Sequence, residues 1–384
     1  MHSNHPNFKL KLNACLVCGS SDLNLRTELK AMSGVASDNQ PWPRFGVPAL
    51  CRACGHIMKL PTDQWRKDVA AIYARYRVYA AGGGKVVRVF TGPESDPRSD
   101  VLLALLCDMV PLPKAGRILD FGCGNGSFLR RFGEDFPEWT LFGHEPGTTS
   151  GILPGIEVFS DPKSLPRELN VVAMTHVLEH LEDPASTLAD LEGRLSSGGT
   201  LFLAVPDLRQ NPLDLAVVDH ASHFTPATLD RLLRRAGWRP LRMEARRIPR
   251  EILLAAQPAA SREAAEDSAS VPASAADLSA GLSALGWLSD TLRRAKDEAA
   301  ARNGLFILGA GNAGTWLAGN LLGSVLGFAD EDADRQGRTH AGLPILAPKD
   351  LPAGATVFIP FPEPMAQAIT RRLHAVRPDI IVLF

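Results

Sequence analysis

Residues Arg117-Ile118-Leu119-Asp120-Phe121-Gly122-Cys123-Gly124-Asn125-Gly126-Ser127-Phe128-Leu129 decide the fold that we expect for this chain. They open with an apolar run of strand length, turn on three glycines and resume with residues that favour a helix. The pattern predicts a strand, a tight turn and a helix whose first backbone N–H groups are free for a ligand. Glycines at alternate positions let a ligand lie against bare backbone, although a purely structural turn could use the same residues.

Two further strand ends strengthen the ligand-binding interpretation. The apolar run Leu141-Phe142-Gly143-His144 ends on Glu145, at the spacing where Rossmann-like folds bind ribose hydroxyls. A third run, 171–174, leads into the segment Thr175 to Pro184. Together the three segments resemble the core of a class I S-adenosylmethionine (SAM) methyltransferase. We therefore assign to SAM binding Asp120, Gly122, Gly124, Asn125, Glu145, Asp161 and His176. For Asp161, a turn-forming Asp-Pro is an equally good interpretation.

Bulk composition excludes several classes of partner. The chain has 384 residues, enough for two or three domains, and 45% of them are hydrophobic. A net charge of −1 gives no general attraction to nucleic acid or to an anionic membrane. The most apolar stretches are too short to span a bilayer, and the first residues lack the apolar core of a signal peptide. We expect a cytoplasmic protein without a nucleic-acid or membrane partner, and no protein partner is evident.

Four of the six cysteines form two Cys-x-x-Cys-Gly motifs, at Cys15, Cys18, Cys51 and Cys54. Each motif places two thiolates one turn apart, and its glycine permits the chain to double back. Four thiolates are the ligands that tetrahedral Zn²⁺ prefers in structural sites. Free buried cysteines or a redox pair are the alternatives, but neither explains two copies of the motif. His56 is a possible substitute ligand.

The order of elements predicts an α/β fold in three parts. We expect a small zinc-binding domain over residues 1–80 and a class I SAM methyltransferase domain, Rossmann-like, over 81–256. An Ala-, Ser- and Pro-rich linker follows at 257–277, and a smaller Rossmann-like domain at 278–384. Predicted strands lie near 117–121, 140–145, 156–159, 171–175 and 200–205, and predicted helices at 99–109, 126–136, 184–196 and 226–236. In the last part Gly309-Ala310-Gly311-Asn312-Ala313-Gly314 lies between a strand and a helix, as in dinucleotide-binding folds.

These three parts, in this order, resemble the three-domain SAM-dependent C-methyltransferases that act on nucleotide-linked deoxysugars. The resemblance covers nearly the whole chain. It rests on the cysteine motifs, the Asp120–Gly126 turn, the Glu179-His180-Leu181-Glu182-Asp183-Pro184 segment and the Gly309–Gly314 turn. It implies SAM and zinc as cofactors and a small-molecule acceptor, a nucleotide-linked sugar.

The loop between residues 208 and 224 is too long for a plain connector and carries the catalytic candidates. His220 matches the residue that the family uses as general base, and Asp219 replaces the family's glutamate beside it. Val217 stands where the family has a tyrosine. Carbon methylation beside a ketone needs such a base, and a neighbouring carboxylate can orient it.

The enolate oxygen formed in that reaction needs a donor, for which His180, Tyr76 and Tyr79 are candidates. Packing explains the tyrosines equally well, and capping of the loop before Asp183 explains His180. His176 and His180, four apart on one helical face, suggest a metal pair. An O- or N-methyltransferase on the same scaffold and an NAD-dependent oxidoreductase that uses the Gly309 turn are the competing functions.

Overall fold

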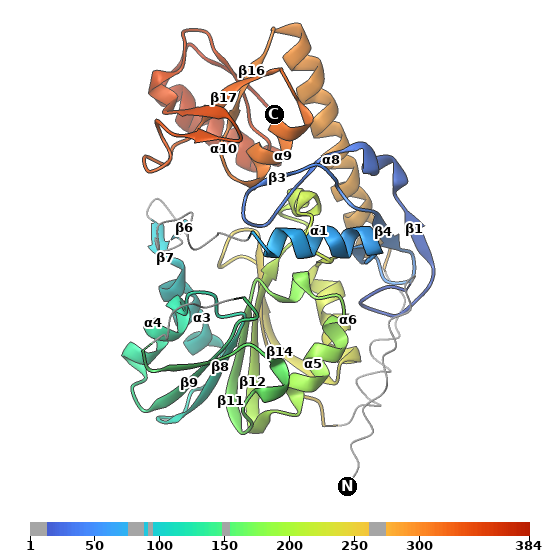
Figure 1. Cartoon of the computed structure of the whole chain (residues 1–384), viewed down its shortest axis with the longest axis vertical. Coiled ribbons are helices and arrows are strands. Elements are labelled where there is room, and N and C mark those ends of the chain that lie inside the picture. The colour runs from blue at the N-terminus through green and yellow to red at the C-terminus, as the bar shows by residue number, and fades with distance from the viewer. Residues whose placement is uncertain (1–13, 76–87, 91–94, 148–153, 261–273) are drawn as a thin grey trace.

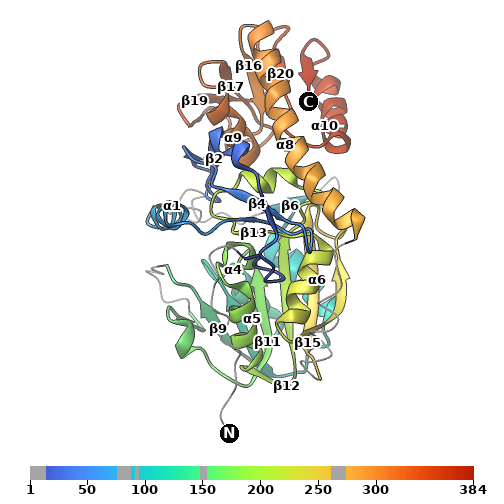
Figure 2. The ribbon, with the colours of Figure 1, turned by 90° about the vertical axis from the view of Figure 1, so that its right-hand side faces the viewer.

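The structure is a computed structural model that describes residues 14–75, 88–90, 95–147, 154–260 and 274–384. Figures 1 and 2 show two α/β bodies at opposite ends of the long axis, with the N-terminal segment between them. In these described ranges no helix combines the length and apolarity that crossing a membrane requires.

A seven-stranded sheet in the order β10-β9-β8-β11-β12-β15-β14 carries the first glycine turn. Strands β8 to β12 are parallel, whereas β15 runs antiparallel to both β12 and β14. The strands are β8 (Gly116–Phe121), β9 (Trp139–His144), β10 (Ile156–Phe159), β11 (Leu169–Thr175), β12 (Leu195–Pro206), β14 (Trp238–Glu244) and β15 (Glu251–Pro258). The five predicted strands are confirmed, and the antiparallel pair β14–β15 is additional to them.

Helices of this body are α3 (Arg98–Met109), α4 (Ser127–Asp135), α5 (Pro184–Glu192) and α6 (Pro226–Arg235), with short 3-10 helices at Pro162–Ser164 and Leu178–His180. Helix α5 ends four residues before its predicted limit because β12 already begins at Leu195. Gly126, with φ of 69°, turns the chain from β8 into α4. At Gly122 an added Cβ would lie 2.3 Å from Cγ2 of Val177, so only glycine fits.

The N-terminal part forms a small sheet in the order β1-β4-β5-β13. Its strands are β1 (Leu23–Leu25), β4 (Pro48–Cys51), β5 (Ile57–Lys59) and β13 (Ser222–His223). The long 208–224 loop supplies β13 and the 3-10 helix Pro212–Ala216. A 3-10 helix at Thr27–Ala31, a hairpin of β2 (Gly34–Val35) and β3 (Pro41–Trp42), and helix α1 (Asp63–Tyr73) complete this part, and β6 (Arg88–Phe90) pairs with β7 (Ser95–Pro97) ahead of α3.

The C-terminal body has a six-stranded sheet in the order β18-β19-β17-β16-β20-β21, parallel except for β18. The long helix α8 (Ala275–Ala301) leads into it past the N-terminal segment (Figure 2). Its other elements are β16 (Leu305–Leu308), α9 (Asn312–Asn320), β17 (Val325–Ala329), β18 (Thr339–His340), β19 (Leu343–Leu346), a 3-10 helix Pro348–Asp350, β20 (Thr356–Phe358), α10 (Glu363–Val376) and β21 (Ile381–Leu383).

The three parts share buried cores. Cys15 and Cys54 pack in one apolar cluster with Phe224 and the inner face of α6. A second cluster joins Val35 of the N-terminal part, Val217 of the long loop and Trp316 of α9. The long loop is therefore held between the N-terminal and C-terminal parts rather than lying free on the surface.

Candidate active site and cysteine cluster

The first glycine turn has the features that a SAM site needs. Gly122, Gly124 and Gly126 all have positive φ, and Asp120 is buried with Oδ1 lacking a hydrogen-bond partner among the described residues. Burial, together with the nearby Glu145 carboxylate, raises the pKa of Asp120 to about 7. Glu145 Oε2 accepts a hydrogen bond of 3.0 Å from the Gly124 backbone N–H. Two carboxylates thus converge on the turn, which fits a cationic ligand that carries ribose hydroxyls.

The other predicted SAM-binding residues occupy different settings. Asn125 Oδ1 accepts from Ser127 N at 3.1 Å and so belongs to the same turn. Asp161 is exposed and caps the 3-10 helix Pro162–Ser164 through Lys163 N. This contact is the turn-forming role of an Asp-Pro pair, and it lies at the carboxyl end of β10.

His176 lies at the end of β11 with a positive φ of 55°. Its Nδ1 is 3.1 Å from Glu179 Oε1, and its Nε2 is 3.2 Å from Glu251 Oε1, which also pairs with Arg98. Burial opposes the charged imidazole, but Glu251 and Glu179 outweigh it and raise the pKa of His176 to about 9. The predicted pairing of His176 with His180 on one helical face is wrong, because the 3-10 helix begins only at Leu178.

His220 is held by Asp214, which the sequence analysis did not single out. Asp214 Oδ1 is 2.8 Å from His220 Nδ1, and Oδ2 is 2.7 Å from His223 Nδ1. Burial opposes ionisation of Asp214, yet the two imidazoles outweigh it and lower the pKa of this carboxyl. Because an ionised carboxylate only accepts hydrogen bonds, the neutral His220 ring carries its proton on Nδ1 and its lone pair on Nε2. The expectation that the adjacent Asp219 orients His220 is therefore corrected, since Asp219 points elsewhere.

Asp219 instead connects His180 to the β2–β3 hairpin. Its carboxylate accepts hydrogen bonds from Ser37 N at 2.9 Å and Ser37 Oγ at 2.5 Å. His180 Nδ1 lies 3.1 Å from the Asp219 carbonyl oxygen and 3.4 Å from Oδ2. Burial acts against a charged His180, but Asp219 and Glu179 raise its pKa overall.

The rings of His180 and His220 meet edge to face, with centroids 4.5 Å apart. The Tyr73 hydroxyl is 3.1 Å from His180 Nδ1, so a tyrosine three residues before the candidate Tyr76 contacts this histidine. Tyr76 and Tyr79 lie outside the described residues. Val177, three residues before His180, packs against Gly122. The short segment 177–180 therefore joins the glycine turn to the histidines.

Lys59 is a buried cation beneath the long loop. Its side chain is 0% exposed, and Nζ donates to the carbonyl oxygen of Val217. Burial lowers the pKa of Lys59 to about 7, although Asp214 and Asp219 act in the opposite direction. Lys59 therefore supports the loop segment in which His220 lies.

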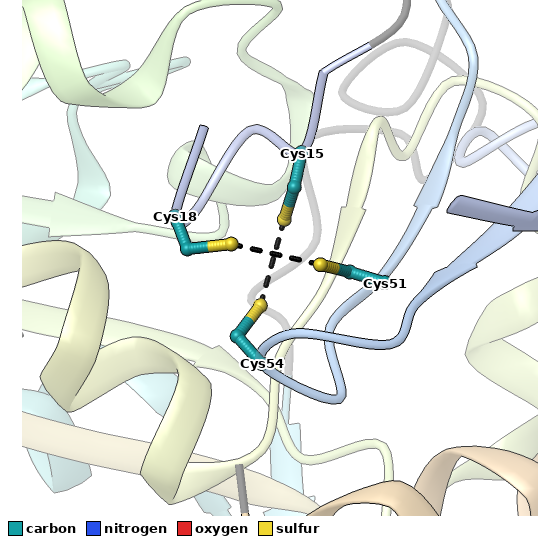
Figure 3. Close-up of side chains that lie close together, drawn as sticks. All are labelled: Cys15, Cys18, Cys51 and Cys54. Atoms are coloured by element: carbon teal, nitrogen blue, oxygen red, sulfur yellow. Dashed lines mark hydrogen bonds between the residues drawn. The ribbon is translucent and has the colours of Figure 1, made fainter. Parts of the chain in front are cut away.

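The four motif cysteines form one cluster (Figure 3). The Sγ atoms of Cys15 and Cys54 are 3.6 Å apart, as are those of Cys18 and Cys51. A tetrahedral zinc with Zn–S bonds of about 2.3 Å requires sulfur–sulfur separations of about 3.8 Å, so the geometry fits this metal. His56 is not in the cluster: it is fully buried and lies against Phe224, with ring centroids 5.4 Å apart.

The second glycine turn faces the same hairpin. Asn39 Nδ2 donates to Ala310 O at 2.7 Å, and Thr315 Oγ1 donates to Asn39 Oδ1 at 2.7 Å. Asp330, directly after β17, accepts a hydrogen bond of 2.8 Å from Ala310 N, so this acid reaches the turn. Ser37 and Asn39 are two residues apart, a span of about 7 Å at most. The hairpin therefore contacts both the histidine cluster and the second turn.

Comparison with known proteins finds a family match for the body that contains the seven-stranded sheet. Residues 97–242 match the model of a methyltransferase domain family, and no curated protein matches the sequence. Together with the sheet order and the glycine turn, this match indicates a SAM-dependent methyltransferase.

Among solved structures, a SAM-dependent methyltransferase from Mesorhizobium loti is 18% identical and matches 41% of this chain and 97% of its own, with a TM-score of 0.34. The 1,6-didemethyltoxoflavin-N1-methyltransferase of Burkholderia thailandensis is 16% identical, with 53% and 96% covered and a TM-score of 0.40. A complex of the Haloferax volcanii Trm112 methyltransferase activator and a putative methyltransferase is 14% identical. It matches 50% of this chain and 98% of its own, with a TM-score of 0.39.

Asp214, Ser37 and Lys59 are among the site residues that were not predicted from sequence. The spacing of Asp214 from His220 and His223 is the one local signal available, because all three lie in one loop. Ser37 and Lys59 lie about 180 and 160 residues away from their partners in sequence. Their contacts therefore depend on tertiary packing alone.

Proposed function

We propose that this chain is a SAM-dependent C-methyltransferase of a nucleotide-linked keto sugar, with His220 as the general base. The observation that carries the proposal is the 2.8 Å contact of Asp214 with His220 Nδ1, which in the neutral ring places the proton on Nδ1 and the lone pair on Nε2. A base of this kind suits removal of a proton from carbon.

The residues divide the chemistry in a simple way. Bound SAM would supply an electrophilic methyl group, held by the turn Asp120–Asn125 and by Glu145. His220 Nε2 takes the proton from the carbon beside the ketone, and Asp214 stabilises the imidazolium that forms. His180, whose pKa is raised, donates a hydrogen bond to the developing enolate oxygen, with Asp219 holding its Nδ1.

The second glycine turn would hold the nucleotide part of the acceptor. The N-terminus of α9 favours an anion such as a pyrophosphate, and the hairpin with Ser37 and Asn39 connects this turn to the histidines. Full activity in a chain truncated after residue 277 would contradict this role. Tight NAD(P) binding would favour the oxidoreductase alternative.

A structural zinc ion at Cys15, Cys18, Cys51 and Cys54 is part of the proposal, as is the division into domains over 1–80, 81–256 and 278–384 with a linker at 257–277. The sulfur geometry and the thiolate ligand set support zinc. The cytoplasm, which keeps thiols reduced, is the proposed setting.

Product analysis tests the reaction type. The full chain is incubated with SAM labelled with carbon-13 at its methyl group and with a nucleoside-diphosphate 4-keto-6-deoxy sugar. Carbon-13 NMR of the product should show the label on a sugar carbon. A label on oxygen would favour the O-methyltransferase alternative. If all of the label remained in SAM, this class of acceptor would be excluded.

A further inference from the structure

Three metal-ligating side chains converge at the histidine pair. One ligand atom of each of Glu179, His180 and His220 lies within 4.8 Å of those of the other two. We propose that these residues bind a divalent transition-metal ion, at a site distinct from the cysteine cluster, and that the metal bound there inhibits the enzyme.

Both histidines are oriented as metal-binding histidines are. Nδ1 of His220 is held by the Asp214 carboxylate at 2.8 Å, and Nδ1 of His180 by the Asp219 carbonyl oxygen at 3.1 Å. Such oxygen acceptors fix the ring and leave Nε2 as the coordinating atom. Among the described residues neither Nε2 has a hydrogen-bond partner, so each can coordinate without breaking a contact of that kind.

Glu179 supplies an independent indication. Its side chain is fully buried, and neither carboxylate oxygen has a hydrogen-bond partner among the described residues. His176 is one cationic neighbour: its Nδ1 is 3.1 Å from Oε1, outside hydrogen-bond geometry. Oε2 has no donor among the described residues, so it can coordinate a dication beside His180 and His220 without losing a hydrogen bond.

The ligand set selects the kind of metal. Two imidazole nitrogens and one carboxylate oxygen suit Zn²⁺, Co²⁺, Ni²⁺ or Fe²⁺, whereas Mg²⁺ and Ca²⁺ prefer oxygen ligands alone. Metal–nitrogen bonds of about 2.0–2.1 Å put neighbouring ligands of a tetrahedral ion about 3.4 Å apart, so small side-chain shifts complete the site. Three protein ligands leave a coordination position open, which distinguishes this site from the closed cysteine cluster.

Inhibition follows from the lone pair of His220 Nε2, and this half of the inference rests on the proposed role of His220 as base. A nitrogen that coordinates a metal cannot accept the proton of the acceptor. Occupation of the site would therefore stop proton abstraction, whereas the SAM-binding turn would be unchanged.

Cobalt titration of the zinc-loaded full chain tests the site. We expect about one further equivalent of Co²⁺ with visible d–d absorption and without the near-ultraviolet thiolate-to-cobalt band that the cysteine cluster would give. His180→Ala and the isosteric Glu179→Gln should each weaken Co²⁺ binding at least tenfold, with zinc content and thermal unfolding used to confirm folding. His374→Ala, which removes an exposed histidine on α10, is the matched control and should bind Co²⁺ normally.

Co²⁺ should also abolish methyl transfer by the wild type, and a chelator added briefly should restore it. A thiolate band, absence of extra Co²⁺, or unchanged binding in both folded variants would overturn the site. Binding without inhibition would overturn the inhibitory half. Failure of the zinc-loaded wild type, without added Co²⁺, to exchange the acceptor's carbon-bound proton would count against the proposed function instead, because that assay does not involve the second metal.

Discussion

Replacement of Asp214 by asparagine is the perturbation that separates the orienting carboxylate from the base it serves. Asparagine keeps the shape of the side chain but presents one oxygen and one NH₂ group to two histidines that both need an acceptor. One imidazole must then move its proton to Nε2. For His223 that nitrogen is buried without a partner, so an N–H there would be unsatisfied. The Nε2 of His220 is not buried in this way. His220 is therefore the ring whose proton moves from Nδ1 to Nε2, and its Nε2 loses the basic lone pair.

The size of the effect follows from the contacts. Loss of a positioned general base lowers turnover by roughly 10²–10⁴-fold, or about 2.7–5.4 kcal/mol of activation free energy. Each of two charge-assisted hydrogen bonds, worth roughly 1.5–3 kcal/mol, becomes a neutral bond worth roughly 0.5–1.5 kcal/mol. The free energy of unfolding should fall by about 2–3 kcal/mol on those values.

The assay compares turnover and urea unfolding for Asp214→Asn and for Asp207→Asn. Asp207, directly before the same loop, is also buried, but its partners are Arg209 and Gln210. The control should lose stability and keep turnover to within a few-fold. Wild-type turnover in a folded Asp214→Asn protein, or an equal loss of turnover in the control, would refute the reasoning.

Three further predictions concern separate parts of the molecule. Protein purified without added metal should contain about one zinc per chain by elemental analysis. Cys54→Ala should lose both the zinc and thermal stability. Unchanged stability of metal-free protein would count against the site. Glu145→Ala should weaken SAM binding about tenfold or more in calorimetry, because hydrogen bonds to a charged acceptor contribute roughly 1.5–3 kcal/mol. Unchanged affinity would mean that the ribose lies elsewhere. Burial lowers the pKa of His223 to about 4 from an ordinary value of about 6.5. The unfolded state therefore binds the extra proton between these values, and unfolding free energy should rise with pH from 4 to 6.5, by roughly 3 kcal/mol from this residue. His223→Gln should flatten that rise, and an unaltered slope would contradict it.

Much of the fold could be predicted because its signals are local. The β8–turn–α4 unit, the parallel strands and the second glycine turn each follow from short runs of apolar residues and glycines. The pair β14–β15 is less visible, since Trp238–Glu244 mixes arginines with apolar residues and shows no clear alternation. The paired cysteine motifs likewise predicted a cluster that the structure brings together.

The site could be predicted only in part. His220 and His180 were found through motifs, but the expected partner of His220 was wrong. Asp219, adjacent in sequence, contacts His180, whereas Asp214, six residues away from His220 and not singled out, contacts His220. Adjacent residues point in different directions, and only the path of the loop between β5 and the hairpin decides which carboxylate meets which ring. Contacts such as that of Ser37 with Asp219 depend on packing between distant segments, which no local pattern records.

Solvent exchange at the acceptor tests the central claim most directly. The wild-type chain and His220→Asn are incubated in deuterium oxide with a nucleoside-diphosphate 4-keto-6-deoxy sugar, with SAM absent, and the acidic carbon position is followed by proton NMR. The account predicts that the wild type exchanges this position, and that the folded variant slows exchange by roughly 10²–10⁴-fold while it retains SAM binding. Exchange that continues unchanged in His220→Asn would contradict the account.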